Sequence, residues 1–334
     1  MSDLSLSILF LAAAALSLGA SWLLVTTLER LGARLGLSEA LLGLLAALAA
    51  DAPEITSATT ALAHHDQRIG AGVVIGSNVF NLATLIGLAA LVAGRIALHR
   101  RVIELTGAVA LWIASVTLAL VLGAFSPAVA LGLVLAVLAP YMVVLGLGHE
   151  RLGRRGASSA AGRWLAAAVA EEEQELEAAI HPRRGRGRDV ALALAGTAVV
   201  VAASAAMERA ASRLGTRHEV PTIVTGALVL AAVTSLPNAV AAVYLARRQR
   251  GPAVLSTALN SNAINVLAGL LIPTSIIGIA RPAGPTTFIA VCYLAMTLLA
   301  LGCAYTERGL RRAEGALILG AYLAFAVLLL AGVY

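Results

Sequence analysis

The sequence predicts an all-α membrane protein of ten transmembrane helices, arranged as two inverted five-helix repeats with broken helices at the membrane midplane. Three observations favour this fold class. The composition is strongly apolar, ten apolar spans of membrane-crossing length follow one another, and a polar motif in the first half recurs in the second half.

The composition argues against a soluble protein. Of the 334 residues, 60% are hydrophobic and only 13% are charged, whereas a soluble domain has roughly 25% charged residues. The net charge of +6 would favour a nucleic-acid partner in a soluble protein. Here it reflects loop arginines, and we expect no nucleic-acid binding. Cys292 and Cys303 lie within one apolar span, which gives neither a disulfide framework nor a metal-binding spacing.

Ten spans of about 20 apolar residues are long enough to cross a bilayer. They run over Leu6–Thr27, Ser38–Ala61, Gly70–Ala93, Val102–Leu122, Ala128–Leu147, Val190–Ala210, Val220–Leu245, Val254–Ile272, Thr286–Tyr305 and Ala316–Tyr334. When the loops are assigned to alternating sides, 19 of the 24 arginines fall on one side. Because positively charged loops stay in the cytoplasm, we expect the central loop there and both termini outside, in a prokaryotic inner (plasma) membrane.

The central loop divides the chain into a first membrane repeat (1–147), a loop (148–189) and a second membrane repeat (190–334). The loop contains clustered arginines, an alanine-rich stretch and an acidic run at Glu171–Glu177. We expect a solvated amphipathic helix there. A calcium-sensing or regulatory role of the acidic run is the alternative.

Two carboxylates and a proline lie in the second span, within Ala50–Glu54. Ionised groups at this depth are costly and usually functional. Proline removes an amide donor and disfavours helix just before it. Pro53 should therefore break the helix and turn its free ends toward a cavity, as in the discontinuous helices of transporters. A second polar stretch, Gly76–Asn81, lies inside the third span, and the two stretches together indicate an ion site.

The second half of the chain repeats this arrangement at an offset of 184 residues. Val233–Asn238 falls over Ala49–Glu54, and Asn260–Asn265 falls over Gly76–Asn81. With five spans in each half, the two copies must enter the membrane from opposite sides. Inverted repeats with broken helices near the midplane are typical of secondary transporters.

At these motifs the chain resembles the calcium/cation antiporter superfamily, sodium/calcium exchanger type. The resemblance rests on Pro53-Glu54, Gly76-Ser77-Asn78, Asn81, Thr234-Ser235-Leu236-Pro237 and Ser261-Asn262. It covers nearly the whole chain, and it implies that the broken second, third, seventh and eighth helices surround a diamond of ion sites. It also implies the ligands Glu54, Ser77, Asn81, Thr234, Ser235 and Ser261.

The chain departs from the usual pattern of that superfamily at four places, one of which is Asn260 where the second motif usually begins with glycine. Where Thr-Ser is usual before the first proline, this chain has Ala50-Asp51. Where acids are usual in the second repeat, it has Asn238 and Asn265. Both central carboxylates, Asp51 and Glu54, therefore come from the first repeat.

The candidate metal ligands are Asp51, Glu54, Ser77, Asn81, Thr234, Ser235, Asn238, Ser261 and Asn265. With carbonyls freed at both prolines, they supply enough oxygens for calcium, which takes roughly six to eight. Two negative charges suffice for one divalent or two monovalent cations. Neighbouring carboxylates in a low dielectric repel each other, so a proton could also be the counter-ion. Left open are a vestibule position for Asp51, and ligation or helix packing for Asn78 and Asn262.

We therefore predict a secondary active antiporter that moves calcium, or a related cation, against sodium by alternating access. The alternatives are a proton-coupled cation exchanger and a monovalent-cation transporter that has lost calcium transport. Neither the charged pore ring of a channel nor the histidines or nucleophile of an intramembrane enzyme accompany the carboxylates. We expect no enzymatic activity and no cofactor. The expected partners are inorganic cations (Ca²⁺, Na⁺ or H⁺) and the lipid bilayer, and the sequence predicts no oligomeric state.

Overall fold

The computed structural model describes residues 2–35, 47–156, 159–177, 186–247, 252–278, 284–306 and 309–333. Nearly all of these residues are helical. The strands in the described ranges, β1 (Arg95–Ala97) and β2 (Gly309–Arg311), form one antiparallel pair. The all-α class is confirmed, and the strand pair was not predicted because three residues are too few to show a period.

The helices of the first half are α1 (Asp3–Leu35), α3 (Ala52–Ala63), α4 (Gln67–Asn81), α5 (Ala89–Ala93), α6 (Arg100–Val121) and α7 (Pro127–Gly156). One helix, α8 (Ala160–Glu177), lies between the halves. The second half contains α9 (Gly187–Arg217), α10 (Thr222–Val224), α11 (Ala231–Thr234), α12 (Leu236–Arg247), α13 (Pro252–Ile264), α14 (Ile272–Ile277), α15 (Gly284–Thr306) and α16 (Arg312–Leu330). Three π-helical segments interrupt these helices: η1 (Leu82–Leu88), η2 (Thr225–Leu230) and η3 (Asn265–Leu271).

Eight described helical spans are long and apolar enough to cross a membrane. The bent pair Thr222–Thr234 and Leu236–Arg247 adds a ninth, so nine of the ten predicted spans have a described counterpart. The remaining one, Ser38–Ala61, falls partly on residues 36–46, outside the described residues. Its described part consists of residues 47–50 and α3. The chain is therefore a multi-pass integral membrane protein.

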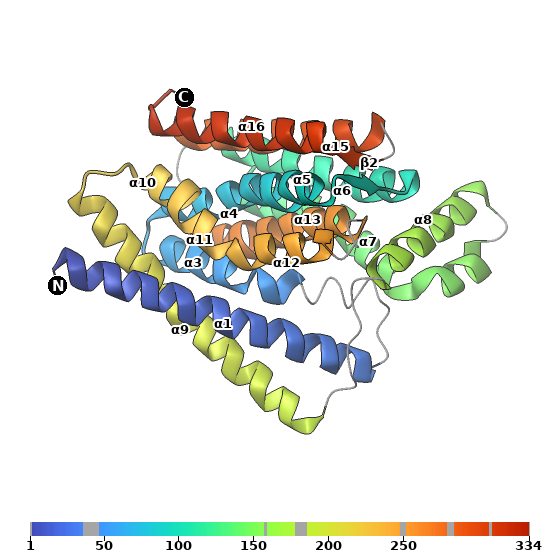
Figure 1. The fold of residues 1–334 in the computed structure, drawn as a ribbon, viewed down its shortest axis with the longest axis horizontal. Helices are drawn as coiled ribbons and strands as arrows, with labels where there is room; N and C mark the ends of the chain where they lie inside the picture. The colour runs from blue at the N-terminus through green and yellow to red at the C-terminus, as the bar shows by residue number, and fades with distance from the viewer. Residues whose placement is uncertain are drawn as a thin grey trace.

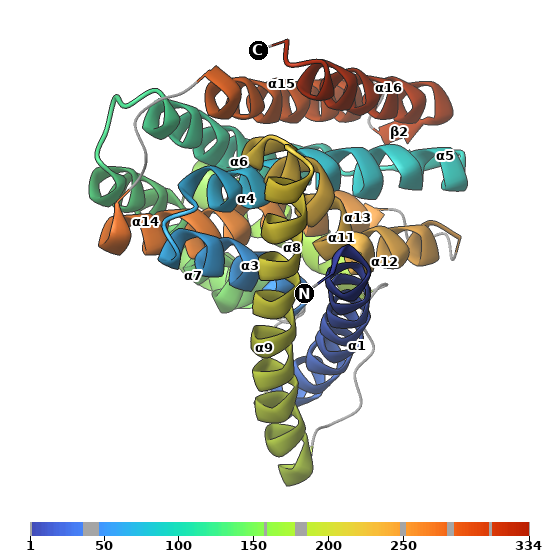
Figure 2. The ribbon, with the colours of Figure 1, turned by 90° about the vertical axis from the view of Figure 1, so that its left-hand side faces the viewer.

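The broken helices occupy the centre of the molecule. α15 and α16 lie along one edge and α1 and α9 along the opposite edge, with α3, α4, α11, α12 and α13 between them (Figures 1 and 2). Burial follows this arrangement. In the most apolar 18-residue stretch of Gln67–Ala93, 89% is buried, against 28% in that of Asp3–Leu35. The polar stretch Gly76–Asn81 therefore lies in the most buried of the described spans.

The internal repeat is visible in the backbone. α3 and α12 have the same bounds when shifted by 184 positions, and each follows one residue that interrupts the helix. That residue is Asp51 (φ −83°, ψ −5°) in the first repeat and Ser235 (φ −85°, ψ 0°) in the second. Pro53 and Pro237 follow two positions later, where each removes an intrahelical hydrogen bond. The helices on either side of Ser235 are bent by 45°.

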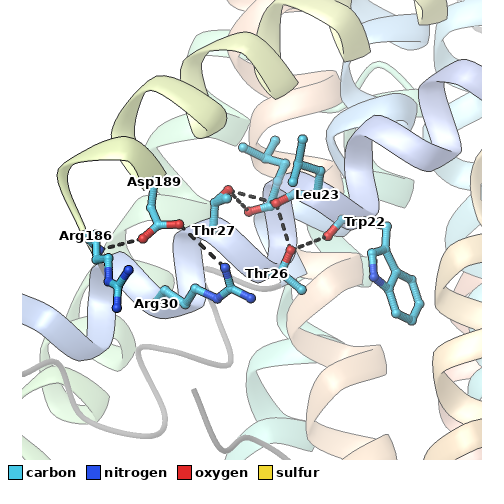
Figure 3. A network of polar contacts seen from close by, with 8 residues as sticks. Trp22, Leu23, Thr26, Thr27, Arg30, Arg186 and Asp189 are labelled. Atoms are coloured by element: carbon cyan, nitrogen blue, oxygen red, sulfur yellow. Dashed lines mark hydrogen bonds and ion pairs between the residues drawn. The ribbon is translucent and has the colours of Figure 1, made fainter. Parts of the chain in front are cut away.

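α1 and α9 form a crossing pair that packs together along its length. Inside it, the buried hydroxyls of Ser17 and Ser204 lie 2.7 Å apart. At the far end, the guanidinium of Arg30 lies 3.6 Å from the carboxylate of Asp189, which also accepts the backbone N–H of Arg186 at 2.5 Å (Figure 3). At the opposite end of the pair, the guanidinium of Arg217 in α9 lies 2.7 Å from the carboxylate of Asp3 in α1. Polar contacts within the pair and at both of its ends therefore join the first helices of the two repeats.

α4 and η2 approach each other closely because glycines line the contact. A Cβ added to Gly76 would lie 2.5 Å from the backbone of Ala227, and one added to Gly226 would lie 2.5 Å from the carbonyl oxygen of Ile69. Small residues allow this backbone approach in membrane helices. The contact joins the two repeats at the start of the polar stretch Gly76–Asn81.

We expect Gly76→Ala to destabilise the protein, because backbone atoms of Ala227 cannot move aside as the end of a side chain could. Overpacking of this kind costs about 1–3 kcal/mol. Thermal unfolding in detergent should show a lower melting temperature. Gly302→Ala in α15 is the matched control, since its added Cβ meets nothing within 4 Å. Equal melting temperatures for the two variants would show that α4 and η2 do not pack this closely.

Candidate cation-binding site

The first helix break is stabilised by a neighbouring helix. Pro53 has no N–H to donate to the carbonyl of Ala49, four residues earlier. That carbonyl instead accepts the hydroxyl of Ser21 from α1 at 2.9 Å. The Ala49 carbonyl, which we expected Pro53 to free, thus has a hydrogen-bond donor, and its second lone pair can still face an ion. The break leaves Glu54 in the first turn of α3, where the helix dipole favours a negative charge.

Asp51 is fully buried and is held by the second repeat. Its Oδ1 atom accepts a hydrogen bond from Nδ2 of Asn238 at 2.9 Å and another from the hydroxyl of Ser261 at 2.7 Å. Asp51 therefore faces the protein interior and not a solvated vestibule. Asn238 and Asp51, two of the positions at which the chain departs from the superfamily pattern, contact each other.

Glu54 is also fully buried. Its Oε1 atom accepts a hydrogen bond from the hydroxyl of Ser235, the residue that interrupts the second broken helix. The carboxylate of Asp51 and the amide of Asn265 are its close neighbours. Among the described residues, neither carboxylate forms an ion pair. The two negative charges are therefore surrounded by neutral hydroxyl and amide groups.

Asparagine side chains join α4 to α13 and η3 beside the carboxylates. Asn78 and Asn262, which correspond at the 184-residue offset, each donate to the other's backbone carbonyl, at 3.2 and 3.1 Å. Asn81 donates to the hydroxyl of Ser261 at 3.4 Å and to Oδ1 of Asn262 at 3.2 Å. Asn265 donates to Oδ1 of Asn78 at 3.4 Å. The described contacts of Asn78 and Asn262 thus join helices.

Two predicted ligands form no described hydrogen bond to the carboxylates or asparagines. The hydroxyl of Ser77 donates to the carbonyl of Val74 at 3.0 Å, and that of Thr234 donates to the carbonyl of Leu230 at 2.9 Å. Both residues are buried in the correct helices, but their hydroxyl protons are directed into their own backbone. Ser21 was missed by the sequence reasoning, because a single serine in an apolar helix carries no motif.

Four oxygen atoms of the predicted ligands are buried and accept no hydrogen bond: Asp51 Oδ2, Glu54 Oε2, Asn81 Oδ1 and Asn265 Oδ1. A buried acceptor without a donor costs about 1–3 kcal/mol, and a bound cation would satisfy several of these neighbouring oxygens at once. Carboxylate and amide oxygens are the ligands that Ca²⁺ and other hard cations prefer. No group of three His, Cys, Asp or Glu able to hold a metal occurs among the described residues, so neutral oxygens must complete this donor set.

Comparisons with known proteins identify the family and the fold. A model of the sodium/calcium exchanger protein family matches residues 5–147 and 189–331, two segments related by the same 184-residue offset. No curated protein matches the sequence at a significant level.

Three solved structures are similar in fold. The H+/Ca2+ exchanger CAX has a TM-score of 0.71 and 15% identity, over 100% of this chain and 87% of that one. Native YfkE has a TM-score of 0.67 and 15% identity, over 98% and 92%. The sodium-calcium exchanger NCX_Mj, soaked with 100 mM Na+ and 10 mM Sr2+, has a TM-score of 0.60 and 19% identity, over 97% and 98%.

The family model covers most of the chain and includes every candidate ligand. Its two matched segments carry the two broken helices whose polar residues meet at Asp51 and Glu54. This chain belongs to the sodium/calcium exchanger protein family.

Proposed function

We propose that this protein is a secondary active antiporter that moves Ca²⁺, or a related divalent cation, against sodium by alternating access. The observation that carries the proposal is the pair of buried carboxylates, Asp51 and Glu54, whose described partners are neutral groups and whose second oxygens accept no hydrogen bond. The candidate ligands remain those predicted from the sequence. Asp51, Glu54, Asn81, Asn238 and Asn265 carry the most direct support.

Charge balance supports exchange and not simple binding. Two carboxylates neutralise one divalent cation or two monovalent cations, but not both at once. Each kind of ion must therefore displace the other, because an extra unpaired charge in the interior faces a large desolvation cost. We infer an exchange of roughly two monovalent ions for one divalent ion, which is electroneutral or weakly electrogenic.

The position of the site supports alternating access. Asp51 and Glu54 belong to the first repeat, while their donors Asn238, Ser261 and Ser235 belong to the second. A relative movement of the two repeats therefore changes access to the ion without dismantling either half, as expected for inverted-repeat transporters. We also propose that the arginine-rich ends of the helices and the central loop lie in the cytoplasm, since 19 of 24 arginines fall on that side.

A specific pair of residues supports retention of divalent transport despite the departures from the superfamily pattern. A carboxylate at position 238 would face Asp51 with like charge, whereas the amide of Asn238 donates to it at 2.9 Å. The acid at 51 and the amide at 238 are therefore compatible as a pair. We infer that the negative charge has moved between the repeats and has not been lost.

Protons are the second candidate counter-ion. When no cation is bound, two neighbouring buried carboxylates cannot both stay ionised without cost, so proton uptake could accompany cation release. One of the structures with the same fold is named an H+/Ca2+ exchanger. A monovalent-cation transporter without calcium transport is the remaining alternative, and calcium binding by the purified protein distinguishes it from both exchangers.

We expect Glu54→Gln to abolish cation exchange while the protein stays folded. The substitution keeps the shape and an acceptor for Ser235 but removes one of two charges. Losing one partner of a buried charge pair costs about 3–5 kcal/mol, so divalent affinity should fall at least about 100-fold. Uptake of ⁴⁵Ca²⁺ into proteoliposomes, with sodium and pH gradients imposed separately, measures this loss and identifies the counter-ion.

Glu104→Gln is the matched control for that experiment. Glu104 forms a partly exposed ion pair with Arg100 at 3.0 Å in α6, and such pairs contribute about 1 kcal/mol or less. Glu104→Gln should therefore transport like the wild type. Normal ion-gradient-driven uptake by Glu54→Gln would contradict the proposed role of this carboxylate.

The inferred move of a carboxylate from position 238 to position 51 gives a second prediction. We expect Asp51→Asn to reduce divalent binding by at least about tenfold, because one of two carboxylates is lost. Adding Asn238→Asp in that background should partly restore binding, since it returns a carboxylate to the neighbouring position. Titration of calcium into the purified variants measures both effects. If Asp51→Asn changes neither the binding nor the transport of any ion, the charge has not moved to position 51.

A further inference from the structure

The helix of the central segment docks against the membrane bundle. α8 packs on α7, α6 and α13, and Ala168, Val169 and Glu172 on one of its faces are fully buried. The sequence predicted a solvated amphipathic helix, and the structure shows that only part of α8 faces solvent. A buried carboxylate is costly unless it is bonded, so the contacts of Glu172 must explain its position.

Glu172 contacts a tyrosine that also contacts the ion-site helix. The hydroxyl of Tyr141 in α7 lies 3.2 Å from Oε1 of Glu172 and 3.0 Å from Oδ1 of Asn260 in α13. All three side chains are buried. A tyrosine hydroxyl has one proton to donate, and here both acceptors lie within reach of it. The position of Glu172 therefore affects the hydrogen bond that Asn260 receives.

Asn260 is directly joined to the candidate cation site. It precedes Ser261, whose hydroxyl donates to Oδ1 of Asp51 at 2.7 Å. A shift of Asn260 along α13 must therefore move the Ser261 hydroxyl relative to the carboxylate. The contacts from Glu172 through Tyr141 and Asn260 thus form a path to the cation site. The first repeat has no such path, because Gly76 occupies the position equivalent to Asn260 and lies against the Ala227 backbone.

Two further contacts fix α8 in this position. The guanidinium of Arg101 in α6 lies 2.6 Å from the carboxylate of Glu171. The imidazole of His149 in α7 lies 2.5 Å from the carboxylate of Glu173. Three consecutive glutamates thus contact two neighbouring helices, and Glu172 is the one that reaches the path to Asn260.

We propose that Glu172 and Tyr141 are positioning residues for the cation site. Through Asn260 they hold Ser261 against Asp51, and the docking of α8 thereby sets the affinity for the transported cation on the side where α8 lies. The inference rests on the proposed function of that site. Because binding couplings are reciprocal, cation binding must in turn change how firmly α8 is docked.

The test measures apparent cation affinity separately on the two faces of oriented proteoliposomes. Glu172→Ala and Tyr141→Phe should raise the KM for ⁴⁵Ca²⁺ on the α8 face at least about fivefold, the lower end of typical couplings between linked sites. The KM on the opposite face should stay unchanged. Glu172→Gln retains an acceptor for Tyr141 and should recover most of the affinity.

Glu171→Gln is the matched control, because it weakens the ion pair to Arg101 but leaves the contact between Glu172 and Tyr141 in place. Because that ion pair also helps to hold α8, the KM on the α8 face should rise, but by less than in Glu172→Ala, and the KM on the opposite face should stay at the wild-type value. Unchanged KM values in Glu172→Ala and Tyr141→Phe, or equal increases on both faces, would overturn the proposal, since equal increases indicate general loosening of the bundle.

Hydrogen exchange of the purified protein separates failure of this inference from failure of the proposed function. Tyr141→Phe should speed amide exchange both in α8 and around Asn260 and Ser261, whether or not the wild type transports calcium. If the wild type moves no cation but the variant shows this faster exchange, the proposed function fails and the coupling of α8 to α13 holds. Unchanged exchange in both segments would overturn the coupling itself.

Discussion

Two buried carboxylates, with no basic side chain among their described partners, are the constraint on which the interior of this protein depends. Asp51 and Glu54 must be held by neutral donors, and the second repeat supplies these from Asn238, Ser261 and Ser235. These hydrogen bonds use one oxygen of each carboxylate and leave the other without a donor. The two repeats are therefore joined most directly at the place where a cation would complete their electrostatics.

Three features allow the two repeats to contact each other around the carboxylates. Proline interrupts a helix at equivalent places in both repeats. In the first repeat, the hydroxyl of Ser21 donates a hydrogen bond to the Ala49 carbonyl, which the proline leaves without its usual donor. Glycines let α4 approach η2 until backbone atoms are in contact. Asn78 and Asn262 join α4 to α13 by reciprocal bonds that follow the internal symmetry. The serine and asparagine side chains thus supply hydrogen bonds to backbone carbonyls, and the glycines leave room for the two helices to pack closely.

Features that depend on local chemistry could be predicted from the sequence. Both breaks, the burial of the carboxylates and nine spans follow from proline geometry and span hydropathy. The contact between Asp51 and Asn238 could not be predicted, because it depends on how two helices 187 positions apart pack. The three π-helical segments have no residue-type signature either. The alanine-rich sequence of α8 predicted a helix, but no pattern in Glu171–Glu177 marks Glu172 as the residue that is buried.

The most direct test of the central claim is a crystal structure of the protein soaked with Sr²⁺, with anomalous scattering used to locate the ion. We predict one strong peak between the two repeats, at about 2.3–2.7 Å from carboxylate oxygens of both Asp51 and Glu54, as expected for a hard divalent ion. Glu54→Gln crystals soaked in the same way should lack this peak. A peak that is absent in the wild type, or that lies away from both carboxylates, would contradict the account.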